Sequence, residues 1–121
     1  MFDKVLSVQS ADLIAPLVEP SMKLAQVKKE IGDNPGDFEN YRRYMEAAAL
    51  YFQMKEYERA LEELKSASAL RPGLAEPHLC MGDCYAKMGR KDDAMKSYRR
   101  ALELNPAEER ARMAVEDMRL K

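Results

Sequence analysis

Residues 81–106 read MGDCYAKMGRKDDAMKSYRRALELNP, and two consecutive stripes of helical spacing cross this stretch. The first stripe begins just upstream and has the spacing i, i+3, i+4 and i+7: it consists of His78, Met81, Gly82 and Tyr85. The second stripe has the spacing i, i+4 and i+7 and consists of Ala94, Tyr98 and Ala101. A short turn beginning at Gly89 separates the stripes, and Pro106 cannot continue a helix interior. The stretch therefore predicts two helices joined by a tight turn.

The same pattern occurs 34 residues earlier in the chain. Six pairs of identical residues coincide at this shift: Tyr51/Tyr85, Met54/Met88, Ala60/Ala94, Ala67/Ala101, Leu70/Leu104 and Pro72/Pro106. The two copies span residues 41–74 and 75–108. Gly82 and its counterpart Ala48 have little or no side chain, so two helices can approach closely there. Because a single hairpin cannot bury both of its faces, the repeat predicts a stacked array.

This pattern resembles the tetratricopeptide repeat (TPR) family, whose motif has an aromatic, Leu, Gly and Tyr on helix A, then Ala, an aromatic, Ala and Pro on helix B. The second copy matches it with His78, Met81, Gly82, Tyr85, Ala94, Tyr98, Ala101 and Pro106, and the first with Tyr44, Ala47, Ala48, Tyr51, Ala60, Leu64, Ala67 and Pro72. The resemblance implies an all-α fold, with helix-turn-helix repeats in a right-handed superhelical solenoid. Two departures are His78 in place of the aromatic and Lys55 at the turn position held by Gly89.

The segments on either side of the two repeats are expected to be helical as well. Residues 109–121 carry an apolar stripe at helical spacing, which predicts a C-terminal capping helix: Ala111, Ala114, Val115 and Met118. Residues 1–40 are expected to form an N-terminal helical segment with one or two short helices packed on the first repeat. This segment is interpreted as a degenerate copy of an earlier repeat. One stripe, Leu24, Val27 and Ile31, ends at the breaker sequence GDNPG of residues 32–36. The alternatives are a segment that docks on a second copy or on a membrane surface.

Composition excludes several classes of function. The chain has 121 residues and a net charge of −1, so no polybasic surface for nucleic acid is expected. No apolar run reaches the roughly 20 residues of a membrane span, and the N-terminus lacks a continuous apolar run, so we expect neither a span nor a secretory signal. Two cysteines without such a signal predict a reducing, cytoplasmic setting. No Gly-rich phosphate loop or nucleophile elbow occurs, so neither an enzyme nor a cofactor is expected.

Both cysteines and the single histidine lie close together in the sequence, which raises the alternative of a metal or redox site. On a helix, Cys80 and Cys84 lie about 40° apart, whereas His78 lies about 200° from Cys80. The three side chains cannot converge on one ion without unwinding the helix, and no second Cys or His pair exists. We therefore predict packing roles for them, with Cys84 as a small buried hydrophobe.

The resemblance also implies a concave wall lined by one face of each helix A. Carried over by position, that wall holds Arg42, Met45, Ala49, Phe52 and Gln53, then Glu76, Leu79, Asp83, Ala86 and Lys87, and then Arg110, Met113 and Asp117. An apolar centre with charges around it is typical of a groove for a peptide or helix. A TPR subclass that clamps chaperone C-termini uses Lys and Asn where this chain has Met45 and Ala49, which disfavours that function.

The predicted function is a non-catalytic protein–protein interaction module, adaptor, scaffold or co-chaperone-like, which binds a peptide or helix of a partner protein. On this reading, Phe52→Ala or Leu79→Asp weakens binding while the fold persists. The alternative is a self-associating structural unit, a homo-oligomer completed by its N-terminal apolar segment, because two repeats are few for an independent solenoid. A cysteine-based redox or metal protein is the remote alternative.

Overall fold

The computed structural model describes residues 20–32 and 36–120, and all regular structure in this part of the chain is helical. The first helix covers residues 20–32. It is followed by α2 (Asn40–Gln53), α3 (Tyr57–Leu70), α4 (Glu76–Lys87), α5 (Lys91–Leu104) and α6 (Glu109–Leu120). The predicted all-α repeat fold is confirmed. None of the described helices combines the length and apolar character needed to cross a membrane.

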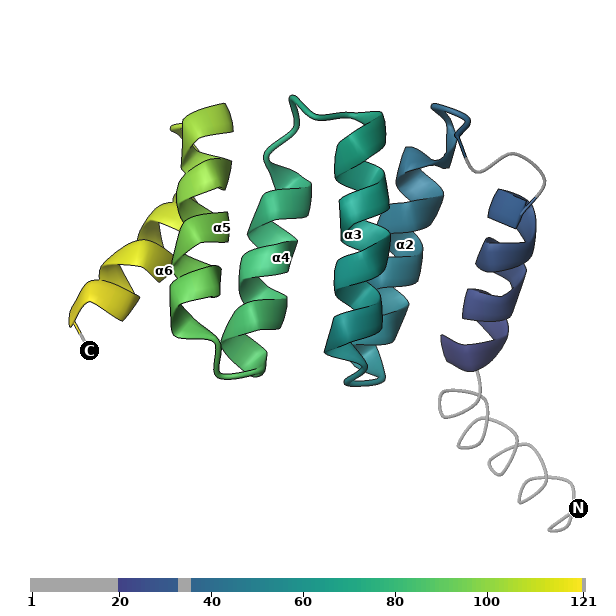
Figure 1. Cartoon of the computed structure of the whole chain (residues 1–121), viewed down its shortest axis with the longest axis horizontal. Coiled ribbons are helices and arrows are strands. Elements are labelled where there is room, and N and C mark those ends of the chain that lie inside the picture. Colours follow the sequence, from purple (N-terminus) through teal and green to yellow (C-terminus); the bar gives the residue numbers. More distant parts are fainter. Residues whose placement is uncertain (1–19, 33–35, 121) are drawn as a thin grey trace, which may run out of the picture.

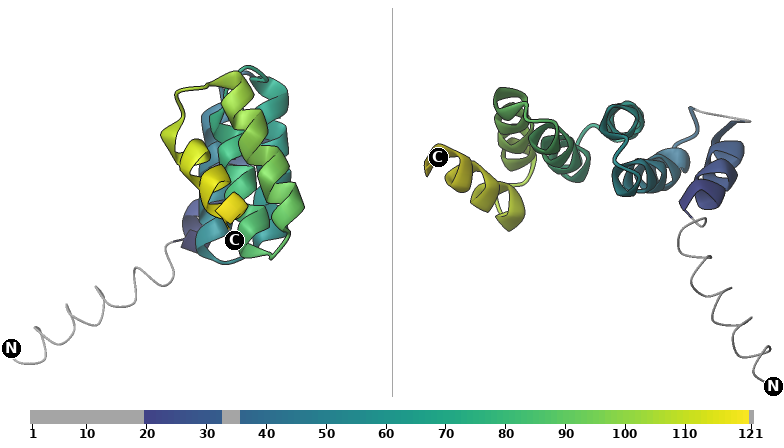
Figure 2. Two further views of the ribbon diagram at one scale, coloured as in Figure 1. Left: turned by 90° about the vertical axis from the view of Figure 1, so that its left-hand side faces the viewer. Right: turned by 90° about the horizontal axis from the view of Figure 1, so that it is seen from below.

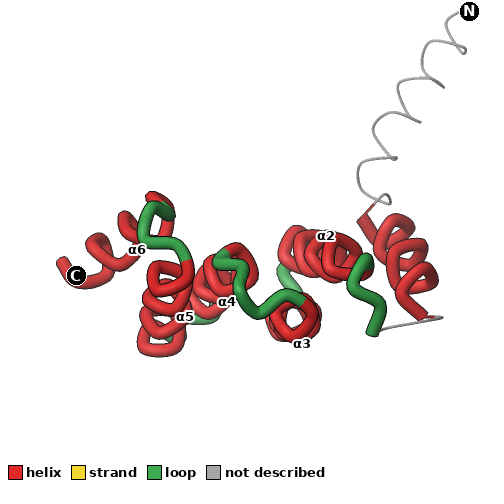
Figure 3. Tube along the Cα trace, turned by 90° about the horizontal axis from the view of Figure 1, so that it is seen from above, coloured by secondary structure: helices red, strands yellow, loops and turns green. Residues whose placement is uncertain are grey.

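The helices stand side by side in a row, with helix 20–32 at one end and α6 at the other (Figure 1). Seen from above, α2, α4 and α6 lie along one side of the row and α3 and α5 along the other (Figure 3). The view from below shows the same zigzag (Figure 2). Helices α2 and α3 pack as one hairpin and α4 and α5 as the next, while α3–α4 and α5–α6 contacts join the hairpins into an array.

The turns inside the two hairpins share one backbone geometry. Lys55 has φ 63° and Gly89 has φ 77°, so both residues adopt the left-handed conformation. The next amide then closes each helix end, because Glu56 N donates to the Tyr51 carbonyl and Arg90 N to the Tyr85 carbonyl, both at 2.9 Å. The left-handed conformation favours glycine, so the Lys55 turn carries a backbone strain that the Gly89 turn avoids.

Helices α3 and α5 end for a different reason, because a proline follows each of them closely. Arg71 and Asn105 leave the helical region of the backbone, with φ −136° and −145°. Each precedes a proline, Pro72 or Pro106, and the proline ring disfavours helical geometry in the residue before it. The two prolines thus set where one hairpin stops and the chain turns to begin the next helix.

Fully buried alanines make the close contacts between helices. They have no exposed surface and occur on every helix from α2 to α6 except α4: Ala47, Ala60, Ala67, Ala94, Ala101 and Ala111. Larger side chains fill the space beside them in two clusters. The first cluster joins helix 20–32, α2, α3 and part of α4, and the second joins α4, α5 and α6. Each helix therefore depends on its neighbours for burial, as in other repeat arrays.

Helix 20–32 packs on the first hairpin through the stripe that the sequence indicated. Leu24, Val27 and Ile31 are buried in the first cluster. On the same helix, Lys28 Nζ lies 3.1 Å from Glu63 Oε1 of α3 and 3.1 Å from the Tyr51 hydroxyl of α2. The helix is therefore tied to both members of the hairpin. Residues 1–19, which carry the other N-terminal expectations, lie outside the described residues.

We expect loss of the Lys28–Glu63 ion pair to loosen helix 20–32. The Glu63 side chain is only 10% exposed, so its charge depends on Lys28 for compensation, while Lys28 is half exposed, which weakens the pair by solvent screening. Glu63→Gln should lower the free energy of unfolding by about 1 kcal/mol and speed amide exchange in residues 24–31. Urea titration and hydrogen exchange measure the two effects.

A matched control is Glu30→Gln, which removes the exposed Arg43–Glu30 pair between the same helix and α2. Its effect should stay below about 0.5 kcal/mol, and equal effects at both sites would contradict the role of Glu63.

Hydrogen bonding to Tyr51 and then to Glu63 raises the pKa of Lys28 above its usual value of 10.5. The stabilisation of the Lys28 ammonium by Tyr51 and Glu63 is therefore present below pH 10.5, and it is lost as the pH rises through the higher folded pKa of Lys28.

At the other end, α6 covers the second cluster as expected of a cap. Ala111 is fully buried, and Ala114, Val115 and Met118 pack partly buried against the same cluster. The residues between them are charged and exposed: Arg112, Glu116 and Arg119. One apolar and one charged face allow α6 to end the array in water.

Candidate protein-binding groove

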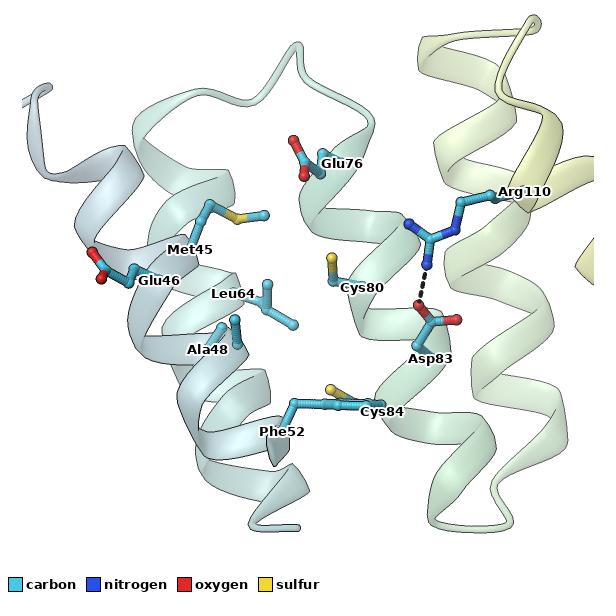
Figure 4. Close-up of a pocket in the computed structure, with 11 residues that line it drawn as sticks. Met45, Glu46, Ala48, Phe52, Leu64, Glu76, Cys80, Asp83, Cys84 and Arg110 are labelled. Carbon is cyan, nitrogen blue, oxygen red and sulfur yellow. Dashed lines mark hydrogen bonds and ion pairs between the residues drawn. The ribbon is translucent and has the colours of Figure 1, made fainter. Parts of the chain in front are cut away.

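An open cavity of about 420 Å³ lies on the side of the array formed by α2, α4 and α6 (Figure 4). Most of its lining is apolar or sulfur-bearing, and charged groups stand around it. The lining consists of Met45, Glu46, Ala48, Ala49, Phe52, Leu64, Glu76, Cys80, Asp83, Cys84 and Arg110. We call this cavity the groove. Its volume is within the range of cavities that hold ligands in proteins.

The floor of the groove is part of the first cluster. Leu64 and Cys84 are each 1% exposed, and Ala48 is also buried. Short side chains at Ala48 and Ala49 leave space that Met45 and Phe52 border from the same helix (Figure 4). Phe52 is held by an edge-on contact with Tyr57, with ring centroids 5.2 Å apart. The floor is therefore a packed surface, and the hairpin contacts beneath it set its shape.

A polar network closes the groove on the α6 side. Asp83 accepts hydrogen bonds from the Tyr98 hydroxyl at 2.5 Å and from Arg110 Nη2 at 3.1 Å. The network joins α4, α5 and α6, and it neutralises the guanidinium that borders the groove (Figure 4). Burial, followed by the hydrogen bond to Asp83, raises the pKa of Tyr98 well above its usual value, so the hydroxyl remains a donor.

The two other charged groups of the groove are acidic. Glu46 on α2 and Glu76 on α4 are both exposed, and neither forms an ion pair with any residue in the described part of the chain. With Asp83 and Arg110, the lining carries three acids and one base, a formal charge of 1 − 3 = −2. The apolar floor is thus bordered by net negative charge.

Six of the thirteen predicted wall residues line the groove: Met45, Ala49, Phe52, Glu76, Asp83 and Arg110. Five others are exposed but do not border it: Arg42, Gln53, Ala86, Lys87 and Met113. The same holds for Asp117 on α6. The lining positions therefore run from Met45 to Phe52 on α2 and from Glu76 to Asp83 on α4.

The placement of Leu79 on the accessible wall is corrected by the structure. Leu79 is 3% exposed and belongs to the second cluster, with Tyr98 of α5 and Ala111 of α6. The cluster joins α4, α5 and α6, so this position is enclosed and not open to a ligand. Leu79 is therefore a core residue, and its replacement by Asp tests the fold instead of binding.

The family pattern, carried over to this chain position by position, did not identify five of the lining residues: Glu46, Ala48, Leu64, Cys80 and Cys84. Ala48, Leu64 and Cys84 were correctly predicted to pack between helices, but the same side chains also form the floor of the open side. The signal for Glu46 and Cys80 was their helical spacing from predicted wall residues, since Glu46 lies three residues before Ala49 and Cys80 lies four residues after Glu76.

The histidine and the cysteines lie in different surroundings. Cys80 and Cys84 border the groove, whereas His78 Nε2 is 3.3 Å from the Ser68 hydroxyl of α3. Burial raises the pKa of Cys80 to about 11 and that of Cys84 to about 12, which disfavours thiolates at neutral pH. Within residues 20–32 and 36–120, His, Cys, Asp and Glu side chains do not gather in threes able to hold a metal ion.

Several solved structures share the fold. MamA superimposes with a TM-score of 0.74 at 23% identity, over 82% of this chain and 56% of MamA, so this chain spans little more than half of MamA's length. The first TPR domain of Spaghetti (RPAP3) bound to the HSP90 peptide SRMEEVD gives 0.76 at 18% identity, covering 93% and 86%. SycD, a type III secretion translocator chaperone of Yersinia enterocolitica, gives 0.72 at 14%, covering 94% and 92%.

A comparison with curated protein sequences finds no significant match. The family comparison is decisive, because the sequence profile described as tetratricopeptide repeat matches residues 51–117, more than half of the chain. The matched range includes α3, the hairpin α4–α5 and most of α6. The chain belongs to the tetratricopeptide repeat family.

Proposed function

We propose that this chain is a non-catalytic interaction module that holds an apolar segment of a partner protein in the groove. The observation that carries the proposal is an open cavity of about 420 Å³ whose floor is apolar and rigidly packed, on the side formed by α2, α4 and α6. Burying apolar anchors on such a surface provides affinity, and charged groups at its edge set the register. Met45 can adapt to the shape of a bound side chain.

The comparisons support a binding role of this kind. One structurally similar TPR domain is bound to a peptide, and another similar protein is a chaperone for a secreted translocator. For this chain we infer an adaptor or scaffold role, in which binding brings the partner to another molecule without chemistry.

The double variant Met45→Gln/Ala49→Gln tests the groove. Both replacements place polar amides over the floor, and both residues favour helix, so the fold should persist. Peptides selected by display on the wild-type chain should bind the variant at least about tenfold more weakly, since apolar anchors then meet polar groups. Fluorescence anisotropy measures the affinity, and circular dichroism verifies folding.

The matched control is Ala69→Gln/Met95→Gln, the same chemical change on α3 and α5. Ala69 is exposed, Met95 is partly exposed, and neither borders the groove. If the peptides lose affinity equally in both double variants, or keep their affinity in both, the binding site lies elsewhere.

Self-association is the second candidate, and exposed apolar side chains at both ends of the array favour it. Met22 on helix 20–32 is 66% exposed and Met113 on α6 is 69% exposed. Contact between the ends of two copies would cover such residues. Analytical ultracentrifugation of the full chain from about 5 to 500 μM, with Met22→Gln as the comparison, tests this candidate. A monomer throughout that range would eliminate it.

A further inference from the structure

The charges around the groove select among possible partner segments. Glu46 and Glu76 carry no ion pair with a described residue, so a ligand meets them as free charges. Arg110, the only base among the lining residues, is already bound to Asp83 at 3.1 Å. An acidic ligand would face two free carboxylates, and the one base that could pair with it, Arg110, already has its charge offset by Asp83. A basic ligand finds two uncompensated acids without breaking anything.

The apolar part of the groove indicates which apolar side chains the partner segment should carry and how they are spaced. Met45, Ala49 and Phe52 lie on one face of α2 at i, i+4 and i+7. They border the space above Leu64 and Cys84, so the apolar strip runs along the helix for about two turns (Figure 4). A strip of that length matches two or three apolar side chains repeated along one face of a partner segment.

Taken with the proposed function, on which this step rests, we infer that the groove binds a basic amphipathic segment of another protein. Its apolar side chains lie on the floor between α2 and α4, and its Lys or Arg side chains pair with Glu46 and Glu76. The chain's own residues 1–19 do not have this chemistry, because they hold one Lys and three Asp or Glu, a charge of 1 − 3 = −2. That segment would bring negative charge to an acidic rim.

Three fluorescein-labelled peptides test the inference. They share one apolar pattern of Leu and Met at i, i+4 and i+7, and differ only in whether the flanking residues are Lys, Gln or Glu. At low salt the Lys peptide should bind most tightly and the Glu peptide at least about tenfold more weakly, with the difference shrinking as salt screens the charges. In ¹³C-methyl NMR spectra, the Met45 signal should shift on binding.

Charge reversal provides the decisive variant. Glu46→Lys/Glu76→Lys should reverse the order, so that the Glu peptide binds more tightly than the Lys peptide. The matched control is Glu62→Lys/Glu103→Lys, which makes the same change of charge at exposed positions on α3 and α5 that do not border the groove. The control should keep the original order.

The outcomes separate this inference from the proposed function. If the Gln peptide shifts Met45 and loses affinity in Met45→Gln/Ala49→Gln, the groove binds apolar segments. Equal affinities of the three peptides in that case would overturn only the basic partner. If no peptide shifts Met45, both ideas fail. A Met45 signal that moves with protein concentration alone would identify a second copy as the occupant and overturn the inference.

Discussion

Leu79→Asp is expected to unfold the C-terminal half of the array. Leu79 is 3% exposed and lies in the second cluster between α4, α5 and α6. The substitution removes apolar contacts and places a carboxylate in a buried apolar cluster. Together these effects should cost about 4 kcal/mol or more at neutral pH, a large part of the stability of a small domain. Urea denaturation followed by circular dichroism measures the loss.

A matched control for this prediction is Ala86→Asp, on the same helix but exposed. It should change the free energy of unfolding by less than about 1 kcal/mol. The deficit of the Leu79→Asp variant should shrink as the pH falls below neutral, since a protonated carboxyl is less costly to bury than a carboxylate. A variant that unfolds within 1 kcal/mol of wild type would contradict the core position of Leu79.

The second large effect is expected at the contact between Gly82 and Tyr98. A Cβ atom added at Gly82 would lie 2.5, 2.6 and 2.8 Å from three carbons of the Tyr98 ring. The ring is buried and its hydroxyl is bound to Asp83, so it cannot move aside freely. Gly82→Ala should therefore destabilise the protein by about 2 kcal/mol, although alanine favours helix by about 1 kcal/mol. Thermal and urea unfolding measure the change.

The first repeat suggests the compensating change. At the two equivalent positions it has Ala48 and Leu64 in place of Gly82 and Tyr98. In a Tyr98→Leu background, Gly82→Ala should be neutral or stabilising, with a coupling energy of about 2 kcal/mol in the double-mutant cycle. Gly73→Ala is the control, because no atom lies within 4 Å of an added Cβ there. Additive effects of the two substitutions would show that steric contact does not link these positions.

The array could be predicted from the sequence because its rules are local. Pro72 and Pro106 end helices through their own rings, and Gly89 suits the turn through its own backbone freedom. The missing side chain of Gly82 indicated a close approach of two helices, and the structure places the Tyr98 ring of the next helix against it. Helix 20–32 was also foreseeable, since its apolar stripe and the breaker after it lie in one short segment.

The groove was only half predictable, because accessibility depends on neighbouring helices. Leu79 and Phe52 were both predicted on the wall, yet Leu79 is enclosed in the cluster that joins α4, α5 and α6, while Phe52 borders the groove. Equally, the Asp83–Arg110 contact joins residues 27 positions apart, and no motif in either segment signals it. Because of that contact, the charge of Arg110 is already offset by Asp83, whereas the sequence alone suggested a base available to a ligand.

By itself the sequence determined the repeat, the ends of its helices and the small-residue contacts that hold each hairpin together. These depend on side-chain size and backbone preference at fixed spacing, which recur in both copies. Only the tertiary structure decided which faces remain open and which charges remain free. Those properties arise where α2, α4 and α6 meet, and they depend on packing between segments that sequence spacing does not relate.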